Sequence, residues 1–240
     1  MKELNIPEKL KNNLKSFIQG LKHIFGEDLI SIILYGSAAS GEFMDKHSNL
    51  NLLVLLKSTE LRYLKEASGI VGKYRMIHPL FLTESYIASS ADTFPVEFLD
   101  MRENYSVLYG KDALSGIVVE TNNLRFQCEQ ELKSKIINLR QLYLRINKDK
   151  TALRNLLFKA FTSILHILRN VLRLKGKGAP YKKEDILRGL IPEFNIDIDI
   201  WRKISSAKKN ELKLSKHDIE PLFINFVKEL EKIVDLVDRI

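Results

Sequence analysis

The residues best suited to chemistry lie between two apolar runs near the N-terminal end of the chain. Gly36 and Ser37 directly follow the first run, and residues 37–41 are predicted to form one turn of helix that includes Ser40. A Gly-Ser turn at the start of a helix presents backbone N–H groups and a hydroxyl, and these donors suit a phosphate. The sequence therefore predicts a phosphate- or nucleotide-binding turn, with Lys46 or Lys57 as a counter-charge.

Two buried strands are expected to hold this turn in place. The runs Leu29–Tyr35 and Leu50–Leu56 are rich in Ile, Leu and Val and have the length of a strand. Continuous apolar runs of this kind are typical of strands buried on both faces of a sheet. Asn49 and Asn51 open the second run, and residues i and i+2 of a strand point to the same face, roughly 7 Å apart.

The order of these elements resembles the DNA polymerase β-like nucleotidyltransferase superfamily, especially small proteins of the aminoglycoside adenylyltransferase type. Residues 35–42, Tyr-Gly-Ser-Ala-Ala-Ser-Gly-Glu, are similar to the Gly-Ser element of that family. Residues 48–54, Ser-Asn-Leu-Asn-Leu-Leu-Val, occupy the place of its Ser-Asp-x-Asp-Leu-x-Val motif. The resemblance implies that Asn49 and Asn51 stand where the family has two metal-binding aspartates.

Replacing the two aspartates by asparagines removes their negative charge but keeps nearly the same side-chain shape. Two carboxylates on one face of a strand can hold Mg²⁺ against a triphosphate. An asparagine carbonyl ligates a hard cation only weakly and cannot offset the charge of two divalent ions. We therefore expect no metal site, with Mg²⁺ and ATP as cofactors only if the protein is an active enzyme.

A third strand is predicted at residues 76–83, where Pro79-Leu80-Phe81 is similar to a Pro-Leu-Glu segment of aminoglycoside adenylyltransferases. The resemblance implies that Phe81 takes the place of the third acid. Asp45, in the turn before Asn49, and Glu97, if residues 94–100 form a strand near the site, are the candidate substitutes. The alternative is that Asp45 is an exposed turn residue, while Glu97 pairs with Arg102 or caps a helix.

The remaining pattern predicts an α+β protein with two domains. Before residue 118, a helix between Pro7 and Gly26, another from Ser58 to about Val71 and a short strand at residues 105–109 complete a small mixed sheet packed with helices. After it, apolar residues recur every three to four positions. We therefore expect a nucleotidyltransferase-like domain at residues 1–118 and an all-α helical bundle at residues 119–240.

Composition and charge exclude several classes of protein. The chain has 240 residues, no apolar run of membrane-spanning length, no N-terminal pattern of a secretion signal and only one cysteine, Cys128, so a cytoplasmic location is expected.

The net charge is +8, but residues 1–120 carry −2 and residues 121–240 carry +10. A basic half can attract nucleic acid, although no Arg-rich run or zinc spacing supports this more specifically. The five histidines lack metal-ligand spacing, and His166 is predicted to lie in the core of the bundle.

Three functions follow from these residues. The first is a nucleotidyltransferase-fold protein that is impaired or inactive in catalysis, a pseudo-nucleotidyltransferase with residual nucleotide or phosphate binding. The second is an active enzyme that transfers AMP from ATP to a small molecule or a protein, with Mg²⁺ held by Glu42, Asp45, Glu97 or the asparagine carbonyls. The third is an interaction module that binds a protein partner, as in toxin–antitoxin pairs, or a second copy of itself.

Overall fold

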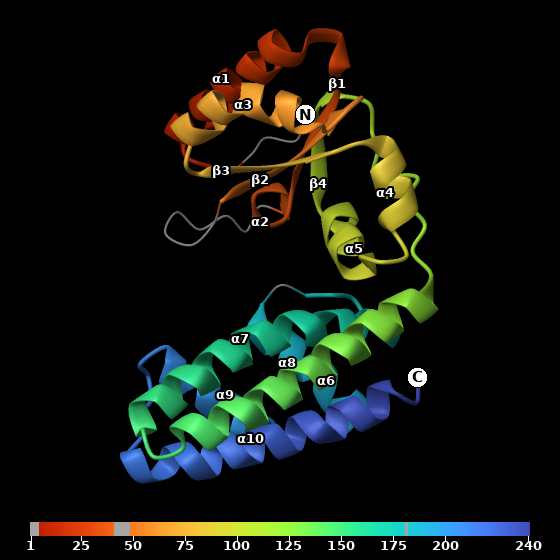
Figure 1. The fold of residues 1–240 in the computed structure, drawn as a ribbon. Helices are drawn as coiled ribbons and strands as arrows, with labels where there is room; N and C mark the ends of the chain where they lie inside the picture. The colour runs from red at the N-terminus through yellow and green to blue at the C-terminus, as the bar shows by residue number, and fades with distance from the viewer. Residues whose placement is uncertain (1–4, 41–48, 181) are drawn as a thin grey trace. The chain divides into compact units, whose positions relative to one another are not determined.

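The computed structural model describes residues 5–40, 49–180 and 182–240. The chain divides into two compact units, residues 1–119 (unit 1) and residues 120–240 (unit 2). Unit 1 contains a four-stranded mixed sheet with helices, and the described part of unit 2 is built from helices (Figure 1). The predicted α+β architecture is confirmed. Among the described residues, no helix is both long enough and apolar enough to cross a membrane.

The sheet of unit 1 has the strand order β3-β2-β1-β4. Strands β2 and β3 run parallel, whereas β1 is antiparallel to both β2 and β4. The elements of unit 1, in chain order, are α1 Glu8–Phe25, the 3₁₀ helix η1 Gly26–Asp28, β1 Leu29–Tyr35, α2 Ser37–Ser40, β2 Leu50–Leu56, α3 Leu61–Lys73, β3 Ile77–Leu82, α4 Glu84–Ser90, α5 Pro95–Glu103 and β4 Tyr105–Gly110.

Each face of the sheet has its own apolar core. On one face, Ile32, Leu52 and Val54 pack in a cluster with the buried side of α1 and with residues of α3. On the other face, Ile33 and Leu53 pack in a cluster with residues of α4 and α5 and with the segment that follows β4. Figure 1 shows α1 and α3 together on one side of the sheet and α4 and α5 on the other. Because both faces are covered, β1 and β2 consist mostly of apolar residues, as their sequences predicted.

Local sequence signals account for most element boundaries in unit 1. The predicted bounds of β1 and β2 are those of the structure, and α1 lies between Pro7 and Gly26, where the helix was expected. The helix expected from Ser58 is instead α3, which begins after Glu60 and continues through Gly72 to Lys73. The packing of Ala67 and its apolar neighbours therefore outweighs the low helix propensity of glycine.

Gly110 closes β4 in a backbone conformation that other residues rarely adopt. Its φ is +73°, and a Cβ added there would lie 2.0 Å from the carbonyl oxygen of Ile30 and 3.0 Å from the Cα of Ser31. Both neighbours are backbone atoms of the adjacent strand, so neither can turn away as a flexible side chain would.

We expect Gly110→Ala to lower the free energy of unfolding by about 2 kcal/mol or more, because the left-handed conformation costs roughly 1–2 kcal/mol and the contact adds to it. Urea denaturation followed by circular dichroism measures this. Gly116→Ala is the matched control, since a Cβ there meets nothing within 4 Å. Equal stability of the two variants would contradict the strain at Gly110.

Unit 2 is built from long helices joined by short connections. They are α6 Thr121–Ile146, α7 Lys150–Leu174, α8 Lys183–Phe194, α9 Ile198–Lys208 and α10 Lys216–Val237. Asp149 caps α7 by accepting hydrogen bonds from the backbone N–H groups of Thr151 and Ala152, and a Ser215–Asp218 capping box begins α10. The single tryptophan, Trp201 of α9, is fully buried against Phe161 and Phe226.

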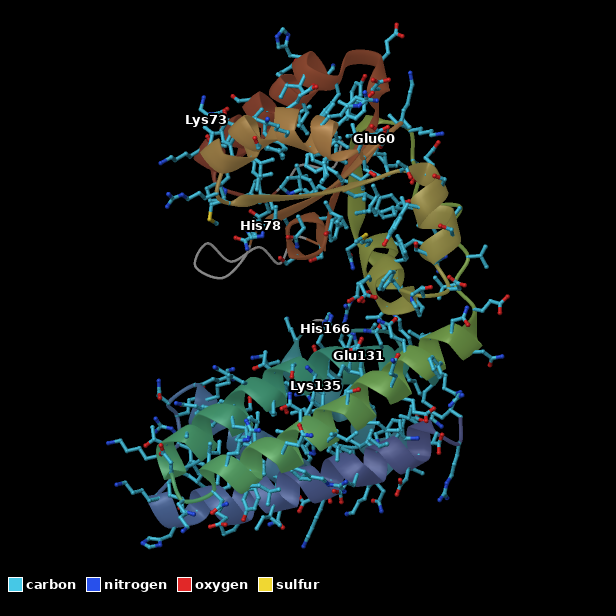
Figure 2. The ribbon with its side chains drawn as sticks, in the orientation of Figure 1. Glu60, Lys73, His78, Glu131, Lys135 and His166 are labelled. Atoms are coloured by element: carbon cyan, nitrogen blue, oxygen red, sulfur yellow. The ribbon has the colours of Figure 1, made fainter. Side chains whose placement is uncertain are left out.

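His166 departs from its predicted place in the core. The residue lies on α7 and its side chain is exposed, although Leu165 and Ile167 on either side of it are buried (Figure 2). Nearly every residue of this last stretch of α7 is buried, and His166 takes one of the few positions that face solvent. Apolar neighbours in sequence therefore did not indicate burial for this histidine.

Candidate functional site

The Gly-Ser turn directly joins β1 to α2. Gly36 has a φ of +78°, and its carbonyl oxygen accepts hydrogen bonds from the N–H groups of Ala39 and Ser40 at 2.9 and 3.0 Å. The Ser40 hydroxyl donates to the Ser37 carbonyl oxygen at 3.1 Å. A Cβ added to Gly36 would lie 3.4 Å from Nδ2 of Asn51. The turn therefore lies beside Asn51, and the glycine leaves room for that amide.

Four residues that pair across the strands form a row on one face of the sheet. Tyr35 of β1 pairs with Tyr105 of β4 on one side and with Asn51 of β2 on the other, and Asn51 pairs with His78 of β3. Directly paired residues point to the same face. We call Tyr105, Tyr35, Asn51 and His78 the site row. It contains two phenols, one amide and one imidazole, but no carboxylate.

Asn49 extends the site row by one more polar side chain. It lies two residues before Asn51, and its Nδ2 is 3.4 Å from Nδ1 of His78. This distance is long for a hydrogen bond, so the contact holds the two side chains close without fixing them firmly. His78 is exposed at the beginning of β3, as Figure 2 shows. The structure thus brings Asn49, Asn51, Gly36 and His78 together.

Phe81 does not belong to this face of the sheet, so its predicted place at the third acidic position is wrong. In the register of β2 and β3, Phe81 pairs with Val54, which lies in the core shared with α1. The Phe81 ring contacts the Phe25 ring with centroids 6.2 Å apart. Because successive strand residues alternate between faces, His78 is the β3 residue beside Asn51.

Glu97 and Lys57 also lie in places that differ from the prediction. Glu97 was a candidate substitute only if residues 94–100 form a strand near the site, but α5 begins at Pro95 and places Glu97 in its first turn, with an exposed side chain. Lys57 follows the far end of β2 and pairs with Asp28 at 3.4 Å, so it is not a counter-charge for the turn. Glu42, Asp45 and Lys46 lie outside the described residues.

The surroundings of the two phenols in the site row favour their neutral form. Burial raises the pKa of Tyr35 above its ordinary value. The pKa of Tyr105 is raised mainly because its hydroxyl donates a hydrogen bond to Asp112 at 2.7 Å. Both phenols therefore stay protonated at neutral pH. Within residues 5–40, 49–180 and 182–240, no group of three His, Cys, Asp or Glu side chains could hold a metal ion.

Sequence reasoning missed three members of the site row: His78, Tyr35 and Tyr105. The spacing of the histidines excluded them as metal ligands, and Tyr35 was assigned to the end of a strand and to the Gly-Ser element without a role in the site. The alternation of side chains along β1 was the available signal for Tyr35. It places Tyr35 on the same face as Ile33, directly before the glycine turn. The partners of Tyr35 on β2 and β4 could be found only from the register.

Comparison with known proteins supports a shared fold. No protein-family model matches the chain. A 56-residue stretch is 48% identical to a protein of Methanocaldococcus jannaschii named provisionally as a protein adenylyltransferase. This match covers 23% of the chain and spans only 37% of that relative's length.

The similarity to a solved structure is much more extensive. The spectinomycin adenyltransferase of Enterococcus faecialis, whose crystal structure contains ATP and spectinomycin, aligns with a TM-score of 0.59. The alignment covers 92% of this chain and 99% of that one, with 10% sequence identity. At this identity the likeness shows the fold, which includes the helical part as well as the sheet.

Proposed function

We propose, from the premise that this chain has the nucleotidyltransferase fold, that it binds a nucleotide through the Gly36–Ser37 turn but transfers nucleotidyl groups poorly or not at all. The observation that carries the proposal is the composition of the site row. Asn51 pairs with Tyr35 and His78, and Asn49 contacts His78, so amides and an imidazole stand where a metal would need carboxylates.

Magnesium chemistry explains why these residues impair transfer. Mg²⁺ prefers hard, charged oxygen ligands and loses its water reluctantly. In a two-metal site the ions stabilise the attacking and the leaving oxygens. The neutral carbonyls of Asn49 and Asn51 cannot offset that positive charge, and His78 offers a nitrogen, which suits softer metals better. A nucleotide in this site therefore lacks firmly held ions.

Retained nucleotide binding has two supports. The turn keeps the geometry of a phosphate cradle: Gly36 adopts a positive φ, and α2 begins directly after it. The solved structure with the same fold contains ATP. Binding without transfer would suit a protein that senses nucleotide or acts in a complex.

A calorimetric titration with ATP tests the proposal. We expect the affinity of the full chain for ATP to be the same with and without Mg²⁺. Ser37→Ala should weaken binding by roughly tenfold, because a hydrogen bond to a charged group contributes about 1.5–3 kcal/mol. Ser134→Ala, at an exposed position of α6, is the matched control and should leave the affinity unchanged.

Two results would contradict the proposal in different ways. Tight binding that depends on Mg²⁺ would mean that ligands outside the described residues restore a metal site. No binding of ATP at all would refute the nucleotide-binding function and favour the interaction module. In that case Ser37→Ala should leave the binding of a protein partner unchanged.

Adenylyl transfer to a protein is the second candidate, and the match to the M. jannaschii protein favours it. Such an enzyme would need Mg²⁺ held by carboxylates such as Asp45 or Glu97. The wild-type chain would then transfer label from radiolabelled ATP, and Glu97→Gln would abolish the transfer.

A further inference from the structure

Unit 2 contains a partly open cavity that the proposed nucleotide site does not use. It has a volume of about 530 Å³ and lies between α7, the end of α9 and the loop that joins α9 to α10. Pockets that hold small molecules have volumes of roughly 300–1,000 Å³. We call it the α7–α9 cavity, after the two helices that form its sides.

The charges in the lining of the α7–α9 cavity are all positive. Arg154 contributes from α7, Lys208 from the end of α9 and Lys213 from the following loop. The lining includes no Asp or Glu from the described residues. Glu211, in the same loop, lies with its carboxylate 3.9 Å from the ammonium group of Lys209. An anion inside the cavity would therefore meet cations without a competing carboxylate.

Lys208 is held in place by neutral acceptors. Its ammonium group donates hydrogen bonds to the carbonyl oxygen of Phe158 at 3.2 Å and to the hydroxyl of Thr162 at 2.6 Å. Burial lowers the pKa of Lys208, and the charge of Lys183 lowers it further. The fold thus keeps a partly buried cation near other cations, an arrangement that an anion would relieve.

The rest of the lining consists of two neutral amides, Asn155 and Asn210, and an apolar part. Phe158 of α7 and Leu212 and Leu214 of the loop contribute to the wall. Simple inorganic anions gain no binding energy from such a surface, because they are strongly hydrated. A ligand that fills the cavity therefore needs both an anionic group and an apolar or ring-shaped body.

We propose that the α7–α9 cavity binds a small organic phosphate, with Arg154, Lys208 and Lys213 on the phosphate and Phe158 and the two leucines on the body. Arg154 offers a planar fork of N–H donors that matches phosphate geometry, and the lysines add point charges. The cavity has the volume of a small-molecule pocket, so a small molecule suits it better than an extended nucleic acid strand.

Titration of the full chain with AMP in the absence of metal tests this site. We expect AMP to bind more tightly than inorganic phosphate, because only AMP fills the apolar part. The double variant Arg154→Gln/Lys213→Gln should weaken AMP binding by at least about tenfold. Lys208 is kept, because its hydrogen bonds to α7 also support the fold.

The matched control is Lys209→Gln/Lys216→Gln. It removes two positive charges from the two ends of the same loop, but neither residue lines the cavity. An equal loss of affinity in both double variants would show general surface attraction and overturn the proposal. So would an absence of AMP binding in the millimolar range. If Ser37→Ala weakens AMP binding and Arg154→Gln/Lys213→Gln does not, AMP binds in unit 1 and the α7–α9 cavity is not its site.

Discussion

Asn49→Asp combined with Asn51→Asp is expected to make ATP binding depend on Mg²⁺, with an affinity at least about tenfold higher in the presence of the metal. The two side chains lie on one face of the sheet beside the Gly36 turn. Carboxylates there would give Mg²⁺ two hard ligands next to the phosphates, and a bound metal ion contributes several kcal/mol of charge stabilisation. Calorimetry with and without Mg²⁺ measures the change.

The control for this variant is Asn138→Asp/Asn225→Asp. Both asparagines are exposed on helices of unit 2, so the change in net charge is the same without any new ligand pair. If the Asn49→Asp/Asn51→Asp variant binds ATP but ignores Mg²⁺, the loss of carboxylates is not what keeps the metal away. The hypothesis of a degraded metal site would then be wrong.

The Asn49→Asp/Asn51→Asp variant should regain nucleotidyl transfer only partly. Beside its two carboxylates the neighbouring strand offers His78, which is not an acid. Adding His78→Asp would complete three carboxylates on neighbouring positions of β2 and β3. Phe81→Asp in place of His78→Asp should not increase transfer activity, since Phe81 lies on the opposite face of the sheet. The release of pyrophosphate from ATP distinguishes the two triple variants.

Trp201→Ala should lower the free energy of unfolding by about 3–5 kcal/mol, the range measured when a large buried aromatic is truncated. The side chain is fully buried, and its ring lies 4.9 Å from the Phe226 ring and 6.1 Å from the Phe161 ring, measured between centroids. Its loss would leave a cavity where α7, α9 and α10 meet. Urea denaturation followed by circular dichroism measures the effect, because the tryptophan signal itself is lost.

Trp201→Phe should cost far less, within about 1.5 kcal/mol. The smaller ring loses packing, but the substitution also removes Nε1, a buried N–H that has no hydrogen-bond partner among the described residues. An unpaired buried donor costs roughly 1–3 kcal/mol of stability. Removing it therefore offsets part of the stability that is lost with the packing of the larger ring. Phe126→Ala, at an exposed position of α6, gives the scale of a surface change. A Trp201→Phe variant as unstable as Trp201→Ala would mean that the ring shape outweighs the unpaired donor.

The sequence was sufficient for the elements that carry their own signals. Strands β1 and β2 are predominantly apolar runs bounded by Gly or polar residues, so their limits could be predicted to the residue. Helix α1 lies between a proline and a glycine, which mark a helix start and stop. The Gly36 turn and the two asparagines were found for the same reason, because they lie at the ends of these runs.

The sequence was insufficient where the outcome depends on pairing between distant segments. Whether Phe81 or His78 faces the site is decided by the offset between β2 and β3, and a shift of one residue reverses every side chain. Whether residues 94–100 form a strand beside the site was left open by the sequence. They belong to helix α5, in which Pro95, Val96 and Phe98 are buried, so burial there follows tertiary packing rather than a simple stripe.

Asn51 and His78 of the site row lie outside the two apolar clusters of the sheet, and this separation has an evolutionary consequence. Ile33 and Leu53 are buried and pair in the next row on the same face, and Tyr35 and Tyr105 pack against their cluster, whereas Asn51 and His78 do not belong to it. Substitutions of the amide and the imidazole therefore leave the apolar framework intact. A lineage could abandon catalysis and acquire a different chemistry at this edge without first evolving a new scaffold.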